Sequence, residues 1–210
     1  MTPDASLPGA LSDTEQEVAR LVVRARDGEV EAFNLLVIRY QNAAYSLAYR
    51  FLGSREAAED VTQEAFLRAY RALATFRGER FGAWLLRIVA NAARDELRRR
   101  GRRPQRSLDE LRDDPDSHGF EPPDTGPTPE ASALQAELRR TLEAALQQLP
   151  EDWRMVVLLS DVHGLSYHEV AEATGLPLGT VKSRLSRARG RLRDILRASG
   201  ELTEPAGRLN

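Results

Sequence analysis

Residues 164–192, GLSYHEVAEATGLPLGTVKSRLSRARGRL, constrain the fold of this chain more than any other stretch. Ser166 and Glu169 have the spacing of a capping box, in which a serine hydroxyl and a glutamate three residues later satisfy the first unpaired amides of a helix. Gly175 can adopt the left-handed conformation that ends a helix, and Pro177 suits the first position of the next one. The sequence therefore predicts two short helices joined by a tight turn.

The second of these helices has an apolar face and a basic face. Val181, Leu185 and Ala188 recur at helical spacing, so their face should lie on a core. An isolated basic run is usually a solvated surface. Behind a capped turn, however, it favours a helix-turn-helix whose second helix enters the DNA major groove. The candidate DNA contacts are Leu178, Gly179, Thr180, Lys182, Ser183, Arg184, Arg187 and Arg191.

Composition excludes several classes of protein. The 210 residues, 41% of them hydrophobic, are enough for one or two domains with a core. The absence of cysteine excludes disulfides, thiolate zinc sites and a cysteine nucleophile, and the three histidines are scattered. We therefore expect no cofactor, no metal site and no catalytic activity. No signal segment or membrane-spanning run is present, so we expect a cytoplasmic protein without membrane insertion.

The net charge of −2 hides two basic segments on either side of an acidic one. Residues 75–106 carry ten arginines against three acidic residues, and residues 162–200 carry seven basic residues against three acidic ones. Between them, residues 107–137 carry nine acidic residues against one arginine. This distribution is typical of a protein with two separate nucleic-acid contacts.

The spacing of apolar residues predicts an all-α protein with two helical domains joined by a flexible linker. Prolines, glycines and acidic residues dominate the stretch between the domains, which resists packing. Neither end of the chain carries helical periodicity. The predicted boundaries are 1–13 for a disordered lead, 14–103 for the first domain, 104–133 for the linker, 134–199 for the second domain and 200–210 for a tail.

The second domain should begin with a helix from about Leu134 to Pro150. We expect Leu138 and Leu142 to face the core along this helix. Asp152 can cap the apolar run that follows, WRMVVLLSDVHG, which should pack beneath the helix-turn-helix.

In the first domain, the helix predicted after Ser54 has two faces. Its core stripe includes Ala58 and Val61, while Asp60, Gln63 and Glu64 share the opposite face with an exposed leucine. Such a surface suits a basic protein partner, although a bare pattern of this kind is more often solvated surface.

The loop FRGERF precedes a helix predicted at about 82–100. Its aromatic rings and the basic face of that helix together provide what single-stranded DNA binding needs, namely ring faces for unstacked bases and cations along the backbone. Phe81 and Trp84 are predicted to belong to the core. For Phe76 the sequence is equally compatible with a core position and with stacking on a base. The candidate contacts are Phe76, Arg77, Arg80, Arg87, Asn91, Arg94 and Arg98.

Two blocks, in this order, resemble the extracytoplasmic-function (ECF, group IV) sigma factors of bacterial RNA polymerase. AAEDVTQEAFLRAYRAL with FRGERFGAWLLRIVANAARDELRRRGRR is similar to region 2 of the family. LQQLPEDWRMVVLLSDVHGLSYHEVAEATGLPLGTVKSRLSRARGRLR is similar to region 4. The resemblance implies a transcription initiation factor that binds core RNA polymerase and directs it to promoters with minus 35 and minus 10 elements, melting the latter.

The resemblance also implies a role for each surface. The face of Asp60, Gln63 and Glu64 corresponds to the one that docks on the β′ clamp helices of polymerase. The loop at 76–81 and the helix after it correspond to the part that recognises and melts the minus 10 element. The helix at 178–191 corresponds to the one that reads the minus 35 element, and its domain to the one that meets the β flap. An anti-sigma factor is an expected partner, as is promoter DNA.

Two other functions are compatible with parts of the sequence. A polymerase-independent DNA-binding regulator would use the helix-turn-helix alone, with residues 14–103 as a sensor or dimerisation module. An enzyme acting on nucleic acid would need clustered carboxylates or a metal site, whereas the acidic residues here gather mainly in the linker.

Overall fold

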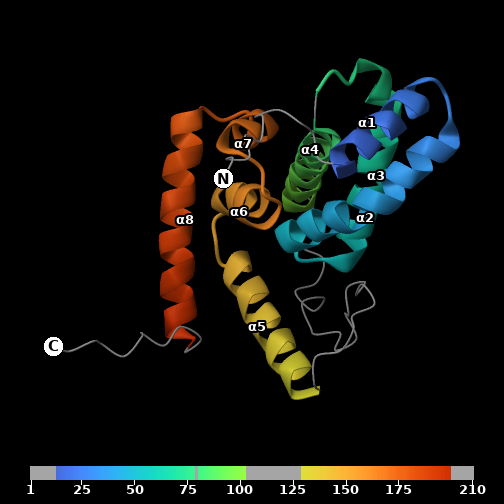
Figure 1. Ribbon diagram of the computed structural model, residues 1–210. Helices are drawn as coiled ribbons and strands as arrows, with labels where there is room; N and C mark the ends of the chain where they lie inside the picture. Colours follow the sequence, from blue (N-terminus) through green and yellow to red (C-terminus); the bar gives the residue numbers. More distant parts are fainter. Residues whose placement is uncertain (1–12, 79, 103–128, 200–210) are drawn as a thin grey trace, which may run out of the picture.

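A computed structural model of the chain describes residues 13–78, 80–102 and 129–199 (Figure 1). The regular structure in these ranges is helical throughout, which confirms the all-α prediction. The predicted tail, the predicted lead except Asp13, and most of the predicted linker lie outside the described residues. The elements are α1 (Asp13–Arg26), α2 (Val30–Leu52), α3 (Arg55–Ala72), the 3-10 turn η1 (Leu73–Thr75), α4 (Phe81–Arg102), α5 (Pro129–Gln147), α6 (Glu151–Val157), the π-helical turn η3 (Leu158–Val162), α7 (Tyr167–Thr174) and α8 (Leu178–Ala198).

In the first domain, α2, α3 and α4 pack on one another and α1 packs on α2. An apolar stripe of α2 is buried, including Leu36, Leu47 and Phe51. Gly53 ends α2 with a φ of 70°, and Ser54 begins α3 by accepting a 3.4 Å hydrogen bond from the Ala57 amide. Local signals therefore define the turn between the two helices.

The second domain contains the predicted helix-turn-helix. The Glu169 amide donates to Ser166 Oγ at 3.3 Å, and the Ser166 amide donates to Glu169 Oε2 at 2.8 Å, which completes the capping box. Gly175 ends α7 with a φ of 70°. The apolar run 155–159 is fully buried beneath α7 and α8, as expected. Pro177 takes the N-cap of α8 rather than its first helical position.

The structure differs from the prediction along α5 and at the start of α6. α5 begins at Pro129, five residues before the predicted Leu134. Leu138 and Leu142 are 52% and 40% exposed, because the first half of α5 projects beyond the domain and only its last turns reach the core (Figure 1). Asp152 is not a cap, since Pro150 holds the N-cap of α6 without a side-chain hydrogen bond.

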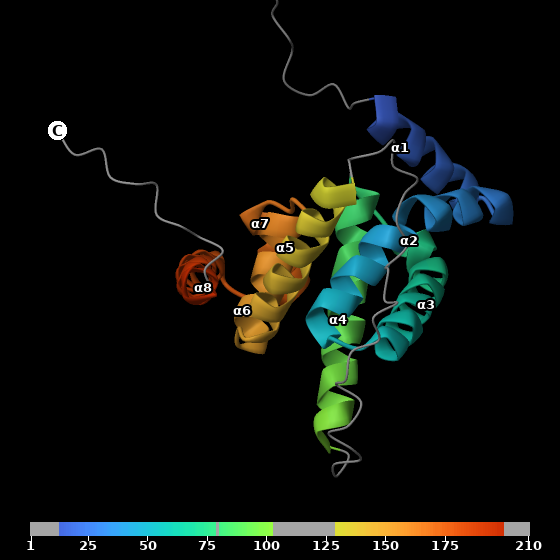
Figure 2. The same cartoon turned by 90° about the horizontal axis from the view of Figure 1, so that it is seen from below.

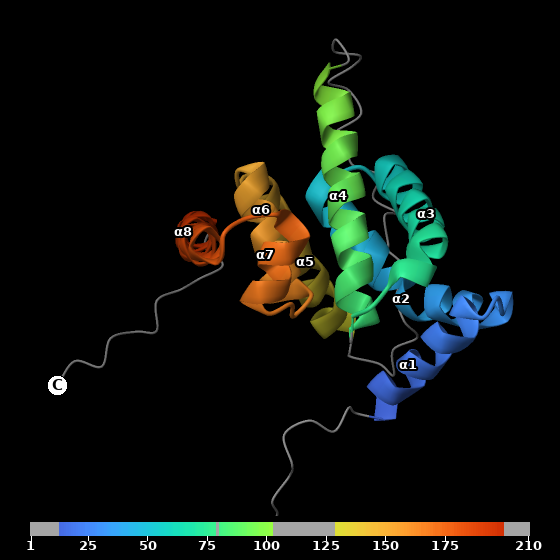
Figure 3. The ribbon, with the colours of Figure 1, turned by 90° about the horizontal axis from the view of Figure 1, so that it is seen from above.

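The two domains pack against each other, with α4 beside α7 and the end of α2 beside α5 (Figures 2 and 3). Their buried apolar side chains form one continuous core. A buried arginine joins them, because Arg154 Nη1 donates to the Phe51 carbonyl of α2 at 2.7 Å. Its Nη2 donates to the carbonyls of Gln147 and Leu149 at 2.7 and 3.1 Å. Nothing in the local sequence predicts this role for Arg154.

Candidate nucleic-acid and polymerase interfaces

The predicted minus 35 residues all lie on α8, outside the stripe that Val181, Leu185 and Ala188 bury. This division follows from the period of 3.6 residues, which separates the apolar and basic side chains onto two sides of one helix. The exposed members are Gly179, Lys182, Ser183, Arg187 and Arg191, and the partly buried ones are Leu178, Thr180 and Arg184.

Two arginines of α8 are held by carboxylates of the helix beneath. Arg184 Nη1 lies 3.0 Å from Asp152 Oδ2, and only 23% of the arginine side chain is exposed. Arg189 donates to both oxygens of Asp161 at 2.6 and 2.9 Å, and these hydrogen bonds raise the pKa of its guanidinium. Arg187 and Arg191 are exposed on α8, whereas Arg184 is paired with Asp152.

Phe76 is buried, with 7% of its surface exposed. Its ring packs on Trp84 and Phe81, at centroid distances of 5.0 and 5.9 Å. In this arrangement Phe76 offers no ring face to a base, because its ring packs on the aromatic side chains at the start of α4. Of the two residues predicted for the core, Phe81 is fully buried and Trp84 is partly exposed.

The predicted minus 10 residues other than Phe76 divide into two groups. Arg77, Arg87, Asn91 and Arg98 are exposed. Arg80, which is also exposed, and Arg94, which is partly buried, contact the second domain. Arg80 Nη1 donates to Glu169 Oε1 and Oε2 at 2.8 and 2.9 Å.

Arg94 is partly buried and makes a long contact of 3.5 Å to the Ala173 carbonyl. Burial lowers the pKa of Arg94, and the nearby Asp152 partly opposes that shift. A cation in this position is stabilised less by water than one on an open surface.

On α3, Asp60 and Gln63 are exposed and Glu64 is partly buried. Arg68 Nε donates to Glu64 Oε1 at 2.7 Å, and this hydrogen bond lowers the pKa of the glutamate. Asp60, Gln63 and Glu64 therefore lie on one side of α3, with Glu64 paired to Arg68.

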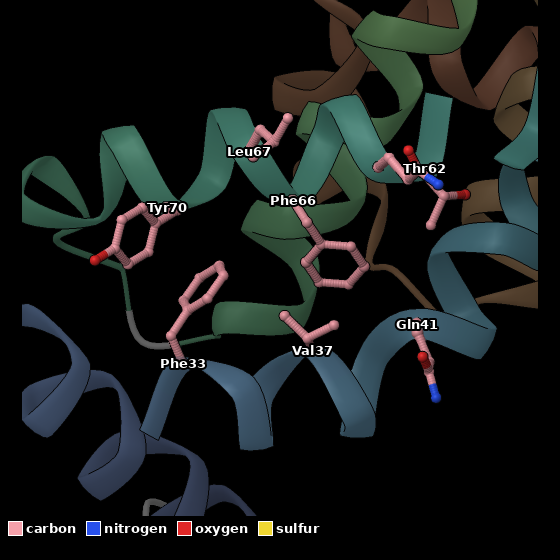
Figure 4. Close-up of a pocket in the computed structure, with 8 residues that line it drawn as sticks. Phe33, Val37, Gln41, Thr62, Phe66, Leu67 and Tyr70 are labelled. Atoms are coloured by element: carbon pink, nitrogen blue, oxygen red, sulfur yellow. The ribbon is translucent and has the colours of Figure 1, made fainter. Parts of the chain in front are cut away.

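An apolar groove between α2 and α3 adjoins this face (Figure 4). Leu67 and Tyr70 are 53% and 45% exposed along it. Sequence reasoning identified the α3 side and missed the α2 side, because the two walls are about 30 residues apart in the chain. The lining residues are Phe33, Val37, Gln41, Thr62, Gln63, Phe66, Leu67 and Tyr70.

Within the described ranges, no three metal-binding side chains come together. Likewise, none of the helices there is long and apolar enough to cross a membrane.

Comparison with known proteins identifies the family. Residues 36–103 match Sigma-70 region 2, and residues 139–192 match Sigma-70, region 4. The chain is 43% identical over 176 residues to the ECF RNA polymerase sigma-E factor of Escherichia coli, covering 80% of this chain and 88% of that protein. This chain belongs to the ECF sigma factor family. As a sigma factor it directs RNA polymerase to promoters, which excludes the polymerase-independent regulator considered above.

Other relatives support the same assignment over most of the sigma factor. The RNA polymerase sigma-H factor of Pseudomonas aeruginosa is 41% identical over 177 residues, covering 84% of this chain and 92% of that protein. The solved structure of CnrH in complex with the cytosolic domain of CnrY matches with a TM-score of 0.62 at 30% identity, covering 87% of this chain and 98% of that one. The sigma factor RpoE of Bartonella quintana, solved with the anti-sigma factor NepR, matches with a TM-score of 0.60 at 26% identity, covering 79% and 96%.

Proposed function

We propose that this sigma factor reads the minus 35 element with α8 and recognises and melts the minus 10 element with α4 and the loop before it. The observation that carries this proposal is the capped helix-turn-helix, in which α8 buries one apolar stripe and exposes Arg187 and Arg191. Exposed arginines on a recognition helix suit base edges and phosphates of the major groove. On α4, Arg87, Asn91 and Arg98 form the exposed surface that suits an unpaired strand.

We further propose that core polymerase docks through its β′ clamp helices on Asp60, Gln63 and Glu64, and through its β flap on the second domain. The acidic face of α3 suits a basic partner, and the adjoining groove offers apolar surface with Leu67 at its edge. A charged rim beside an apolar centre is the usual anatomy of a protein interface.

We also infer an anti-sigma factor as a partner. Two solved structures similar to this chain hold a second protein, which is the anti-sigma factor NepR in one case and the cytosolic domain of CnrY in the other. Both similarities extend over most of this chain, including both helical domains, which supports a protein partner of the same kind.

Run-off transcription tests the proposed function. The purified protein is added to bacterial core RNA polymerase with promoter fragments, including the one upstream of its own gene. Salt-sensitive start sites that core polymerase alone does not produce are the expected result. No new start site, with duplex DNA still bound by the protein alone, would refute the proposal.

The docking face has its own test. Reversing Asp60 and Glu64 together to arginine should reduce affinity for core polymerase, because like charges then face a basic partner. The matched control reverses Asp27 and Glu31, two exposed acidic residues near the start of α2, with the same change in net charge. Equal co-purification of both double variants with core polymerase would count against the docking face.

A further inference from the structure

Arg189 lies on α8 outside the residues assigned to the minus 35 element, and it joins α8 to the elements that precede it. Its Nε and Nη2 donate to the two carboxylate oxygens of Asp161 at 2.9 and 2.6 Å. Hydrogen bonding to Asp161, and to Tyr167 at the start of α7, raises the pKa of the guanidinium. One arginine side chain therefore connects η3, α7 and α8.

Asp161 lies in the π-helical turn η3, which directly follows α6. The His163 amide donates to the Leu158 carbonyl, five residues earlier, at 3.0 Å. A π-helical turn contains one residue more than an α-helical turn, so it changes the direction in which its side chains leave the helix. Such turns are rare and are frequently found at functional sites. We therefore infer that η3 sets the direction of the Asp161 carboxylate toward Arg189.

A second ion pair holds the other side of α8. Arg184 Nη1 lies 3.0 Å from Asp152 Oδ2, and Asp152 lies near the start of α6. Arg184 and Arg189 are five residues apart, which places them about 140° apart around the helix axis at about 100° per residue. The buried apolar stripe of α8 falls between them at the same spacing. The two pairs therefore flank the face on which α8 packs against α6 (Figures 1 and 3).

This arrangement restrains rotation of α8 about its own axis. Burial of apolar side chains is non-directional, so the stripe alone tolerates small rotations. A carboxylate that accepts two hydrogen bonds from one guanidinium adds directional specificity. An atom about 6 Å from the helix axis moves by about 1 Å when the helix turns by about 10°. That displacement exceeds the range of about 0.5 Å over which hydrogen-bond lengths vary, so a small rotation is enough to break contacts with base edges.

We propose that Asp161 is a positioning residue for recognition of the minus 35 element, because its pair with Arg189 fixes the rotation of α8. The side chains that read base edges then enter the major groove at a defined angle. Phosphate contacts carry no direct sequence information and depend mainly on charge. The pair therefore determines sequence specificity more than total affinity. The inference rests on the proposed minus 35 role of α8, and it names the residues that position that helix.

Two substitutions disrupt the pair and leave one partner in place. Asp161→Asn removes the charge of the carboxylate. Arg189→Lys keeps the positive charge but loses the planar group that contacts both oxygens. The matched controls are Glu172→Gln on α7 and Arg193→Lys on α8, which make the same kinds of change at exposed positions of the same domain.

The first measurement is the affinity of polymerase holoenzyme, assembled from core polymerase and each full-length variant, for two fluorescein-labelled duplexes. One carries the minus 35 element of a promoter mapped by run-off transcription, and in the other that element is replaced. Both substitutions should reduce the ratio of the two affinities by at least about five-fold, the equivalent of one base contact. The affinity for the replaced duplex should stay within about two-fold of wild type, since phosphate contacts are retained. Both controls should keep the wild-type ratio.

The second measurement replaces each base pair of the minus 35 element in turn. Loss of one contacting side chain, as in Arg187→Ala, relaxes the preference at the position that this side chain reads. Rotation of the whole helix displaces every base contact at once. Asp161→Asn should therefore relax the preference at several positions.

Each contrary result has a distinct meaning. An unchanged ratio of affinities, or an equal fall in affinity for both duplexes, would overturn the inference, because the pair would then do no more than stabilise the domain. Tighter binding of both duplexes by Asp161→Asn would also overturn it, because the carboxylate would then only withhold Arg189 from a phosphate. Relaxed preference at a single position would replace the positioning role by a direct contact. A wild-type holoenzyme that does not distinguish the two duplexes would instead refute the proposed minus 35 role of α8 itself.

Discussion

Acidification should destabilise this fold in part through His163. The imidazole lies mostly buried at the end of η3, and its Nε2 has no hydrogen-bond partner among the described residues. Burial, and to a smaller extent the charge of Arg50, lowers the pKa of His163 to about 4 from 6.5. The folded protein therefore holds this ring neutral at a pH where the unfolded chain protonates it.

The sign and size of the effect follow from this difference. Because the folded pKa of His163 is the lower one, the unfolded chain takes up the proton first as pH falls. The free energy of unfolding should therefore decrease between about pH 6.5 and pH 4, and the His163 contribution should become constant below that range. A difference of about 2.5 pKa units, at about 1.36 kcal/mol each, amounts to about 3 kcal/mol.

Urea denaturation from pH 7 to pH 4 tests this prediction. The comparison includes wild type, His163→Asn, and His168→Asn as a control at an exposed position of α7. Other titrating groups affect all three proteins alike, so the difference between their pH profiles isolates His163. The His163 variant should lose about 3 kcal/mol less than wild type over this range. Parallel profiles for all three proteins would refute the claim that His163 is buried in its neutral form.

Three further predictions concern stability and promoter recognition. Arg154→Met leaves three backbone carbonyls without their donor and should reduce the free energy of unfolding by about 3 kcal/mol in urea denaturation. Gly190→Ala should raise it by about 1 kcal/mol, because the position is inside α8 and an added Cβ meets nothing within 4 Å. Gly175→Ala should lower it by about 1–2 kcal/mol, since φ there is 70°. Arg187→Ala and Arg184→Ala should each weaken the binding of polymerase holoenzyme to a duplex that carries the minus 35 element. If the arginine contacts a base edge, the loss should be about 1–3 kcal/mol. If it contacts a phosphate, the binding affinity should depend less steeply on salt concentration.

Each of these has a contradicting result. Wild-type stability of Arg154→Met would show that the buried arginine does not join the domains. Equal changes in the free energy of unfolding for Gly190→Ala and Gly175→Ala would mean that the backbone conformation at each glycine does not determine the effect of the substitution. Unchanged promoter binding in both Arg187→Ala and Arg184→Ala would remove α8 from the minus 35 contact.

The helix-turn-helix could be predicted from sequence because its signals are local. Ser166, Glu169 and Gly175 satisfy or permit particular backbone groups within a few residues, so their spacing is enough to define α7 and its end. The acidic face of α3 is similarly local, since residues three and four apart share one side of a helix.

The packing of the two domains could not be predicted in this way. The Arg80 contact to Glu169 joins residues 89 positions apart, and the Arg154 contact to Phe51 joins residues 103 apart. The periodicity of apolar residues within a helix does not predict contacts between residues so far apart in the chain. The same reason explains Phe76, Leu138 and Leu142, whose burial or exposure depends on which neighbouring element reaches them rather than on their own helix pattern.

Run-off transcription on altered templates is the most direct test of the central claim, that one chain brings polymerase to a two-part promoter. Three templates are compared, one intact, one with the minus 35 element replaced and one with the minus 10 element replaced. The account predicts a start site that requires core polymerase, the protein and both elements. Initiation that is indifferent to both replacements, or a protein that binds duplex DNA without ever directing polymerase, would contradict it.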